Sequence, residues 1–204
     1  MATFTVIIPT VGRATLRQTL ASVAPQLRNG DAVHVLRNND GDYGNRARND
    51  AIARAITSHL CFLDDDDEWL RDALDDMRAF ADEYPDRVGV FRARYDALGD
   101  TGTPQNLAQV GTPMLVVPNI PGKVGRFGPA DVSDPLIRPA RPGETEADLA
   151  AQFSDYEFLR STLELLDSAP VFVPVVTTVI RPERGAWRKL RYRTASLRRR
   201  FERR

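Results

Sequence analysis

The amino-acid sequence predicts an α/β fold with a mostly parallel central sheet flanked by helices, in a single domain. Three short apolar runs, at residues 4–8, 32–36 and 60–63, alternate with segments at 15–27 and 47–56 whose apolar residues recur at helical spacing. Strands and helices that alternate in this way form parallel sheets with right-handed crossovers. The 204 residues are enough for one substantial core, and we do not expect a second.

The rest of the chain is predicted to extend the same domain. The remaining elements are expected at residues 69–84 (helix), 88–91 (strand), 114–117 (strand), 155–166 (helix) and 171–180 (β-rich). Residues 96–146 are rich in proline and glycine. A loop of this length inside a compact domain is often a lid or a binding loop.

The composition is that of an ordinary globular protein, because 42% of the residues are hydrophobic and 27% are charged. The single cysteine, Cys61, cannot form an internal disulfide, which favours a reducing compartment. Its apolar neighbours predict a small buried side chain rather than a nucleophile. The N-terminus lacks the features of a signal peptide, and no apolar run approaches the roughly 20 residues of a membrane-spanning helix. We therefore expect a cytoplasmic protein.

The net charge of zero conceals a strong asymmetry along the chain. Residues 181–204 hold eleven of the 28 basic residues and two of the 28 acidic ones, which leaves 17 basic and 26 acidic residues in positions 1–180. Apolar residues such as Trp187 and Leu190 interleave with the arginines of this basic tail. The pattern predicts peripheral contact with an anionic membrane, at its inner face, through an amphipathic helix. A solvated terminus is the alternative, and nucleic acid is the less favoured partner.

Polar residues follow each of the first three predicted strands. Pro9 and Thr10 follow the first, with Arg13 beyond, while residues 37–40 follow the second and the acidic residues 64–67 follow the third. Ligands of open parallel sheets bind beyond the carboxyl ends of the strands. The sequence therefore predicts a binding site where these three segments meet.

The run of five acidic residues at 64–68 is the most unusual feature of the sequence. Adjacent carboxylates repel one another, and a divalent cation such as Mg²⁺ or Mn²⁺ relieves the repulsion because it prefers hard oxygen ligands. Such an ion would bridge a nucleotide diphosphate and stabilise its charge as it leaves. A solvated loop, or an acidic N-terminus for the helix expected near Trp69, is the alternative. The position of the run at a strand end favours a site.

Three motifs in order resemble family 2 glycosyltransferases of the GT-A fold. They are IIPTVGR at residues 7–13, ARNDAI at 47–52 and FLDDDDEW at 62–69. The resemblance implies a Rossmann-like domain that binds a nucleotide-diphosphate sugar. It implies a nucleotide-sugar-binding half at residues 1–95 and an acceptor-side half at 96–180, with the basic tail at 181–204 after them.

The second half resembles the family through MLVV at residues 114–117, VGRF at 124–127 and FSDYEF at 153–158. The resemblance implies that Asp155 is the catalytic base, although Ser154 replaces the glutamate that usually precedes it. Asp155 also stands at the start of an expected helix, where an acidic residue is favourable without any catalytic role.

The resemblance also implies roles for individual residues around the donor. Asp66 matches the position that binds the metal most directly, and Asp64 is its second expected ligand. Asp64 and Asp65 match positions near the ribose and the diphosphate. Asp67 is expected to cap the following helix instead.

Further donor contacts are implied in the other two segments. Pro9, Thr10 and Arg13 match the loop that lines the nucleotide, and Arg48 is placed to reach the diphosphate. Asn38 matches the position that reads the edge of the base. Residues 38–41 are also favourable turn residues, and Arg13 could instead form a surface ion pair.

The implied reaction is a metal-dependent, inverting transfer of a sugar to a hydroxyl of a saccharide, lipid-linked or protein acceptor, as in polysaccharide biosynthesis. Two alternatives stay open. A sugar nucleotidyltransferase would share the nucleotide and the metal, but the segment at residues 9–13 lacks the glycine-rich phosphate loop of those enzymes. A non-catalytic nucleotide-sugar-binding or scaffold protein would share the fold without turnover.

Overall fold

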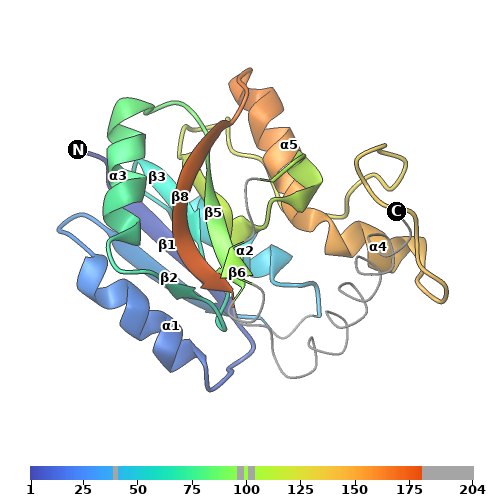
Figure 1. Ribbon diagram of the computed structural model, residues 1–204, viewed down its shortest axis with the longest axis horizontal. Helices are drawn as coiled ribbons and strands as arrows, with labels where there is room; N and C mark the ends of the chain where they lie inside the picture. The colour runs from blue at the N-terminus through green and yellow to red at the C-terminus, as the bar shows by residue number, and fades with distance from the viewer. Residues whose placement is uncertain (39–40, 96–98, 101–103, 181–204) are drawn as a thin grey trace.

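A single mixed sheet forms the centre of the molecule in the computed structural model (Figure 1). The structure describes residues 1–38, 41–95, 99–100 and 104–180, and within them the sheet has eight strands. The strands are β1 (Phe4–Thr10), β2 (Ala32–Arg37), β3 (His59–Phe62), β4 (Glu68–Trp69), β5 (Gly89–Tyr95), β6 (Gly99–Asp100), β7 (Leu115–Pro118) and β8 (Val171–Ile180). Their order is β2-β1-β3-β7-β5-β8-β4, with β6 paired to β5.

Most of the paired residues lie in parallel ladders. β1 runs parallel to both β2 and β3, and β5 runs parallel to β8. β7 is antiparallel to its neighbours β3 and β5, while β4 and β6 add short antiparallel pairs. The predicted mostly parallel α/β domain is confirmed, with β7 as the antiparallel strand at its centre.

Helices cover both faces of the sheet (Figure 1). The helices are α1 (Leu16–Val23), α2 (Asn45–Arg54), α3 (Ala73–Glu83), α4 (Glu146–Gln152) and α5 (Ser154–Leu166), with short 3₁₀ turns at Ala24–Gln26, Leu107–Gln109 and Thr112–Met114. Val6 and Ile8 of β1 pack with α1 and α3, whereas Ile7 between them packs with α2 and α5. Because successive strand residues point to opposite faces, one apolar run supplies both cores.

The helix expected at residues 69–84 begins later than the sequence suggests. Glu68 and Trp69 form β4 and pair with β8, and the helix starts at Ala73. Trp69 is buried in the core beside α1, and its backbone N–H donates to Ser22. The prediction that Asp67 caps this helix is therefore wrong, because Asp72 occupies the N-cap position.

The proline- and glycine-rich segment is ordered by local contacts in its described part, 104–146. Ala130, Ile137 and Leu149 form a small core with Tyr156 of α5. A capping box at Thr145 starts α4. The predicted strand at 114–117 is present one residue later, as β7.

Two other expectations concern membranes and the cysteine. No helix in the described part of the chain is long and apolar enough to cross a membrane. The basic tail at 181–204 lies outside the described residues, as do Asn39 and Asp40. Cys61 is buried in β3, and burial raises the pKa of its thiol, so it is a core residue as expected.

A buried ion pair joins the start of β1 to α3 beneath the sheet. Arg78 of α3 donates to the Asp31 carboxylate at 2.8 Å and to the carbonyl of Ala2 at 2.6 Å. Burial alone would raise the pKa of Asp31, but hydrogen bonds from Arg78 and from the backbone N–H groups of Arg28 and Phe4 outweigh it and lower that pKa. The pair fixes the beginnings of β1 and β2, and hence the register of the strands that end at the site.

We predict that Asp31→Asn lowers the free energy of unfolding at neutral pH by about 3 kcal/mol, because it leaves Arg78 buried without its counter-ion. The lowered pKa means that the ionised carboxylate stabilises the fold above about pH 4 and that this contribution is lost as the pH falls through the folded-state pKa. The difference in the free energy of unfolding between wild type and variant should therefore become smaller in acid. Denaturant unfolding at several pH values measures it.

Asp75→Asn is the matched control. Asp75 also pairs with an arginine, Arg28, at 2.8 Å, but both side chains are about half exposed. The expected loss is below about 1 kcal/mol. Equal losses in the two variants would contradict a special role for the buried pair.

Candidate functional site

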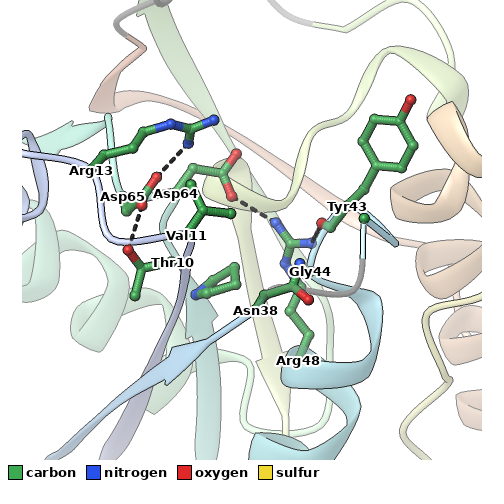
Figure 2. Close-up of a pocket in the computed structure, with 11 residues that line it drawn as sticks. Thr10, Val11, Arg13, Asn38, Tyr43, Gly44, Arg48, Asp64 and Asp65 are labelled. Atoms are coloured by element: carbon green, nitrogen blue, oxygen red, sulfur yellow. Dashed lines mark hydrogen bonds and ion pairs between the residues drawn. The ribbon is translucent and has the colours of Figure 1, made fainter.

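A cavity of about 620 Å³ lies where the carboxyl ends of β1, β2 and β3 meet. Its size is in the usual range for a small-molecule site. The residues that line it come from the segments after these strands and from the start of α2: Pro9, Thr10, Val11, Arg13, Asn38, Gly41, Tyr43, Gly44, Arg48, Asp64 and Asp65. The structure thus brings together all seven residues that the sequence predicted to contact a nucleotide sugar (Figure 2).

Asp65 joins the segment after β3 to the segment after β1. Its side chain is almost fully buried, accepts a hydrogen bond from the Thr10 hydroxyl at 2.5 Å and pairs with Arg13. The Thr10 hydroxyl in turn accepts the N–H of Gly12 at 2.9 Å. Arg13 therefore forms an ion pair, as the alternative interpretation held, but the pair lies in the cavity wall with a buried carboxylate.

Arg48 occupies the centre of the site (Figure 2). Its guanidinium donates to Asp64 at 2.6 Å and to the carbonyl of Tyr43 at 2.7 Å, and it lies 5.2 Å from the centroid of the Phe127 ring. Only 6% of the Arg48 side chain is exposed, whereas 41% of Asp64 is. Arg48 thus presents a buried positive charge, and Asp64 presents a carboxylate to the cavity.

The fit of a metal ion rests on Asp64 and Asp66. Among the described residues, no three His, Cys, Asp or Glu side chains converge to hold an ion unaided. Mg²⁺ needs no such cage, since it is often bound by one or two carboxylates together with substrate phosphates and water. Asp64 lines the cavity, and Asp66 lies beside it in the loop with a carboxylate 3.6 Å from Arg13. Asp64 and Asp66 are the carboxylates that would hold an ion binding together with a diphosphate, and of the two only Asp64 lines the cavity.

Asn38 is buried at the end of β2, whereas a residue of an open turn would be exposed to solvent. It is 7% exposed, and its backbone N–H donates to Thr10 at 2.8 Å, which extends the β1–β2 ladder by one residue. It lines the cavity. The structure thus places Asn38 on the cavity wall, where the sequence predicted it.

Asp155 lies beyond the cavity wall, in the first turn of α5. Its Oδ2 accepts the backbone N–H of Thr112 at 3.1 Å and faces the Thr112 hydroxyl at 3.5 Å. Burial raises the pKa of Asp155; the positive charge of Arg48 opposes the shift, and the negative charge of Asp64 adds to it. Asp155 does not line the cavity, but its charge interacts with two residues that do.

Phe127 joins the two sides of the site. Asn49 of α2 binds both backbone groups of Phe127, accepting its N–H at 2.9 Å and donating to its carbonyl at 2.8 Å. The Phe127 ring stacks on Phe158 of α5, with centroids 4.1 Å apart and planes 5° from parallel. No sequence motif indicates this partner for Asn49, because Phe127 lies far away along the chain.

The loop before α2 contains cavity residues that the sequence motifs did not single out. Asp42 accepts the backbone N–H groups of Gly44 and Arg46, at 3.0 and 2.8 Å. Gly44 has φ +84°, and a Cβ there would lie 2.9 Å from Cβ of Pro9. Tyr43 precedes it with φ +59°. The two glycines that flank this polar stretch were the available signal of a shaped loop.

Comparison with known proteins bears on the family and the fold. The family model for glycosyl transferase family 2 matches residues 26–129, half of the chain. A search of curated proteins finds no match. Among solved structures, S. aureus TarS (residues 1–349) is similar with a TM-score of 0.51 and 14% identity, over 88% of this chain and 60% of that one.

Two further TarS structures carry ligands. The complex with UDP-GlcNAc has a TM-score of 0.52 and 16% identity, over 90% of this chain and 59% of that one. The complex with UDP has a TM-score of 0.50 and 14% identity, over 89% and 61%. The chain thus spans about 60% of the length of these structures, and at this identity the likeness shows the fold. The predicted GT-A-like fold class is confirmed.

We predict that Gly44→Ala destabilises the protein by about 2 kcal/mol more than Gly41→Ala. Both glycines have positive φ, so both variants pay for a left-handed alanine. A Cβ at Gly44 meets Pro9 and lies 3.1 Å from Arg48, whereas a Cβ at Gly41 has nothing within 4 Å. The difference therefore isolates overpacking between the loop and β1. Equal melting temperatures for the two variants would show that the loop accommodates the Cβ at position 44 without a loss of stability.

Proposed function

Since the chain belongs to glycosyl transferase family 2, we propose that it transfers a sugar from a nucleotide-diphosphate sugar to an acceptor hydroxyl, with inversion and with Mn²⁺ or Mg²⁺. The observation that carries this proposal is the cavity at the ends of β1, β2 and β3, which gathers all seven predicted donor contacts beside the acidic run. The TarS structure with UDP-GlcNAc makes UDP-sugars the first donors to test.

The charges in the cavity support the metal. Arg13 pairs with Asp65 and lies near Asp66, and Arg48 pairs with Asp64. In this set the carboxylates outnumber the arginines, so an added diphosphate would meet net negative charge. Asp64 and Asp66 would hold a divalent cation, which would offset this repulsion and supply electrostatic stabilisation of the departing diphosphate.

Asp155 is the proposed base. Both of its hydrogen bonds within the described residues end on Oδ2, so that Oδ1 is available to accept a proton. As the acceptor oxygen attacks the anomeric carbon, its proton passes to Asp155, the new C–O bond forms, and the bond from that carbon to the diphosphate breaks. Attack opposite the leaving group inverts the anomeric centre.

The first experiment measures donor binding by thermal unfolding. UDP-, GDP- and dTDP-sugars are added with and without Mn²⁺ to the wild type and to Asp64→Asn and Asp66→Asn. At a hundred times its dissociation constant, the correct donor should raise the melting temperature by about 5–10 °C, only with metal, and less in both variants. A folded wild type that responds to none of these donors would refute the proposed function.

We predict that Asp155→Asn lowers the rate of transfer about 10²- to 10⁴-fold while the donor still raises the melting temperature, because the base acts on the acceptor and not on the donor. Glu157→Gln is the control, since Glu157 lies in the same first turn but pairs with Arg160 at 2.8 Å. Its activity should stay near wild type. Full activity in Asp155→Asn would remove Asp155 as the base.

The raised pKa of Asp155 also gives the expected pH dependence. The base works only when deprotonated, and burial raises its pKa above the ordinary value of about 3.9. The transfer rate should therefore fall on the acidic side at a higher pH than an ordinary aspartate would cause. Loss of donor binding over the same pH range would assign the fall to the carboxylates of the cavity instead.

A non-catalytic nucleotide-sugar-binding protein is the remaining candidate, and Ser154 is the residue that favours it. Ser154 is buried, where the family usually has a glutamate beside the base. Metal-dependent donor binding without turnover, in wild type and Asp155→Asn alike, would support that candidate over the transferase.

A further inference from the structure

Tyr43 is an exposed aromatic side chain on the wall of the candidate cavity. It lines the cavity and is 57% exposed, and it is the aromatic residue among the lining residues that the structure describes. Val11, also on the wall, is 53% exposed. An exposed aromatic ring on a cavity wall offers a planar apolar surface to a ligand in the cavity.

The loop holds Tyr43 in place on both sides. The buried guanidinium of Arg48 donates to its carbonyl at 2.7 Å. Gly44 follows directly and packs against Pro9 so closely that no Cβ fits, and the Asp42 carboxylate accepts the Gly44 N–H. The Tyr43 backbone also has φ +59°, a conformation that tyrosine seldom adopts without such support. The ring therefore projects from a backbone that is fixed relative to the cavity.

The position of the ring separates it from the charged part of the site. Figure 2 shows Tyr43 on one side of the Arg48–Asp64 pair, with Thr10, Val11 and Arg13 on the other. Arg13, Arg48 and the aspartates form the part of the cavity that suits phosphates. Asn38, with its donor and acceptor amide, lies between the two sides in this view.

A planar, exposed ring beside a phosphate-binding region suits the planar base of a nucleotide. We propose that the Tyr43 ring is the stacking platform for the nucleobase of the donor. The inference rests on the proposed function, which supplies the nucleotide, and it identifies the residue that contacts its base. Stacking suits any planar base, so Tyr43 adds affinity while hydrogen bonds to the base edge discriminate.

The test compares ligands with and without a base. Binding of UDP, GDP, dTDP and inorganic pyrophosphate, each with Mn²⁺, is measured by calorimetry on wild type, Tyr43→Phe, Tyr43→Leu and Tyr43→Ala. For the nucleotide that wild type binds best, we expect about tenfold weaker binding in Tyr43→Ala, weaker binding in Tyr43→Leu, and near-wild-type binding in Tyr43→Phe. Pyrophosphate should bind equally to all four proteins, because it has no base.

Several results would overturn the inference. If Tyr43→Ala weakens the binding of pyrophosphate and of the nucleotide equally, Tyr43 affects the phosphate-binding part of the site around Arg48 and not the base. Unchanged nucleotide binding in Tyr43→Ala would remove any role in recognition. Tyr43→Gly, which tolerates the positive φ, gives the same comparison if the alanine variant does not fold. A wild type that binds no nucleotide would refute the proposed function as well, whereas the other results leave it standing.

Discussion

The buried guanidinium of Arg48 connects several segments of the chain around the candidate site. It reaches Asp64 after β3, the carbonyl of Tyr43 in the loop before α2, and the Phe127 ring, while its charge acts on Asp155 at the start of α5. A buried positive charge is costly unless it is paired and hydrogen-bonded. The surrounding loops are therefore held in the one arrangement that gives Arg48 its partners. The shape of the cavity follows from this requirement.

Phe127 extends the same constraint across the sheet. Asn49 fixes its backbone, and Phe158 stacks against its ring three residues after Asp155. The cavity residues and Asp155 lie in different halves of the chain, and the contacts of Phe127 join α2 to α5, the helix that carries Asp155. It also gives a physical reason for the adjacent Arg48 and Asn49, because one contacts the Phe127 ring and the other its backbone.

Local patterns in the sequence were sufficient for the fold and for seven of the residues that line the cavity. The strands at β1, β2 and β3 are continuous apolar runs, and parallel pairing brings their polar ends together without any further information. Local patterns failed where a distant contact decides the outcome. Trp69 looks like a helix start, yet β8 pairs with it as a strand. Tyr43 was missed for another reason: no sequence pattern indicates that its backbone carbonyl accepts a hydrogen bond from Arg48, five residues later.

The contacts around Asp155 bear on how an acceptor would be chosen. Thr112, which holds Asp155, belongs to the turn before β7, and Tyr156 beside it packs in the small core with Ala130 and Ile137. Tyr156 also donates to Asp134 at 2.6 Å, and Arg138 pairs with Glu144 at 2.7 Å. The segment expected to be a lid is thus tied to the helix that carries the proposed base. A displacement of this segment would therefore change the surroundings of Asp155, and under the proposed function it would affect the base.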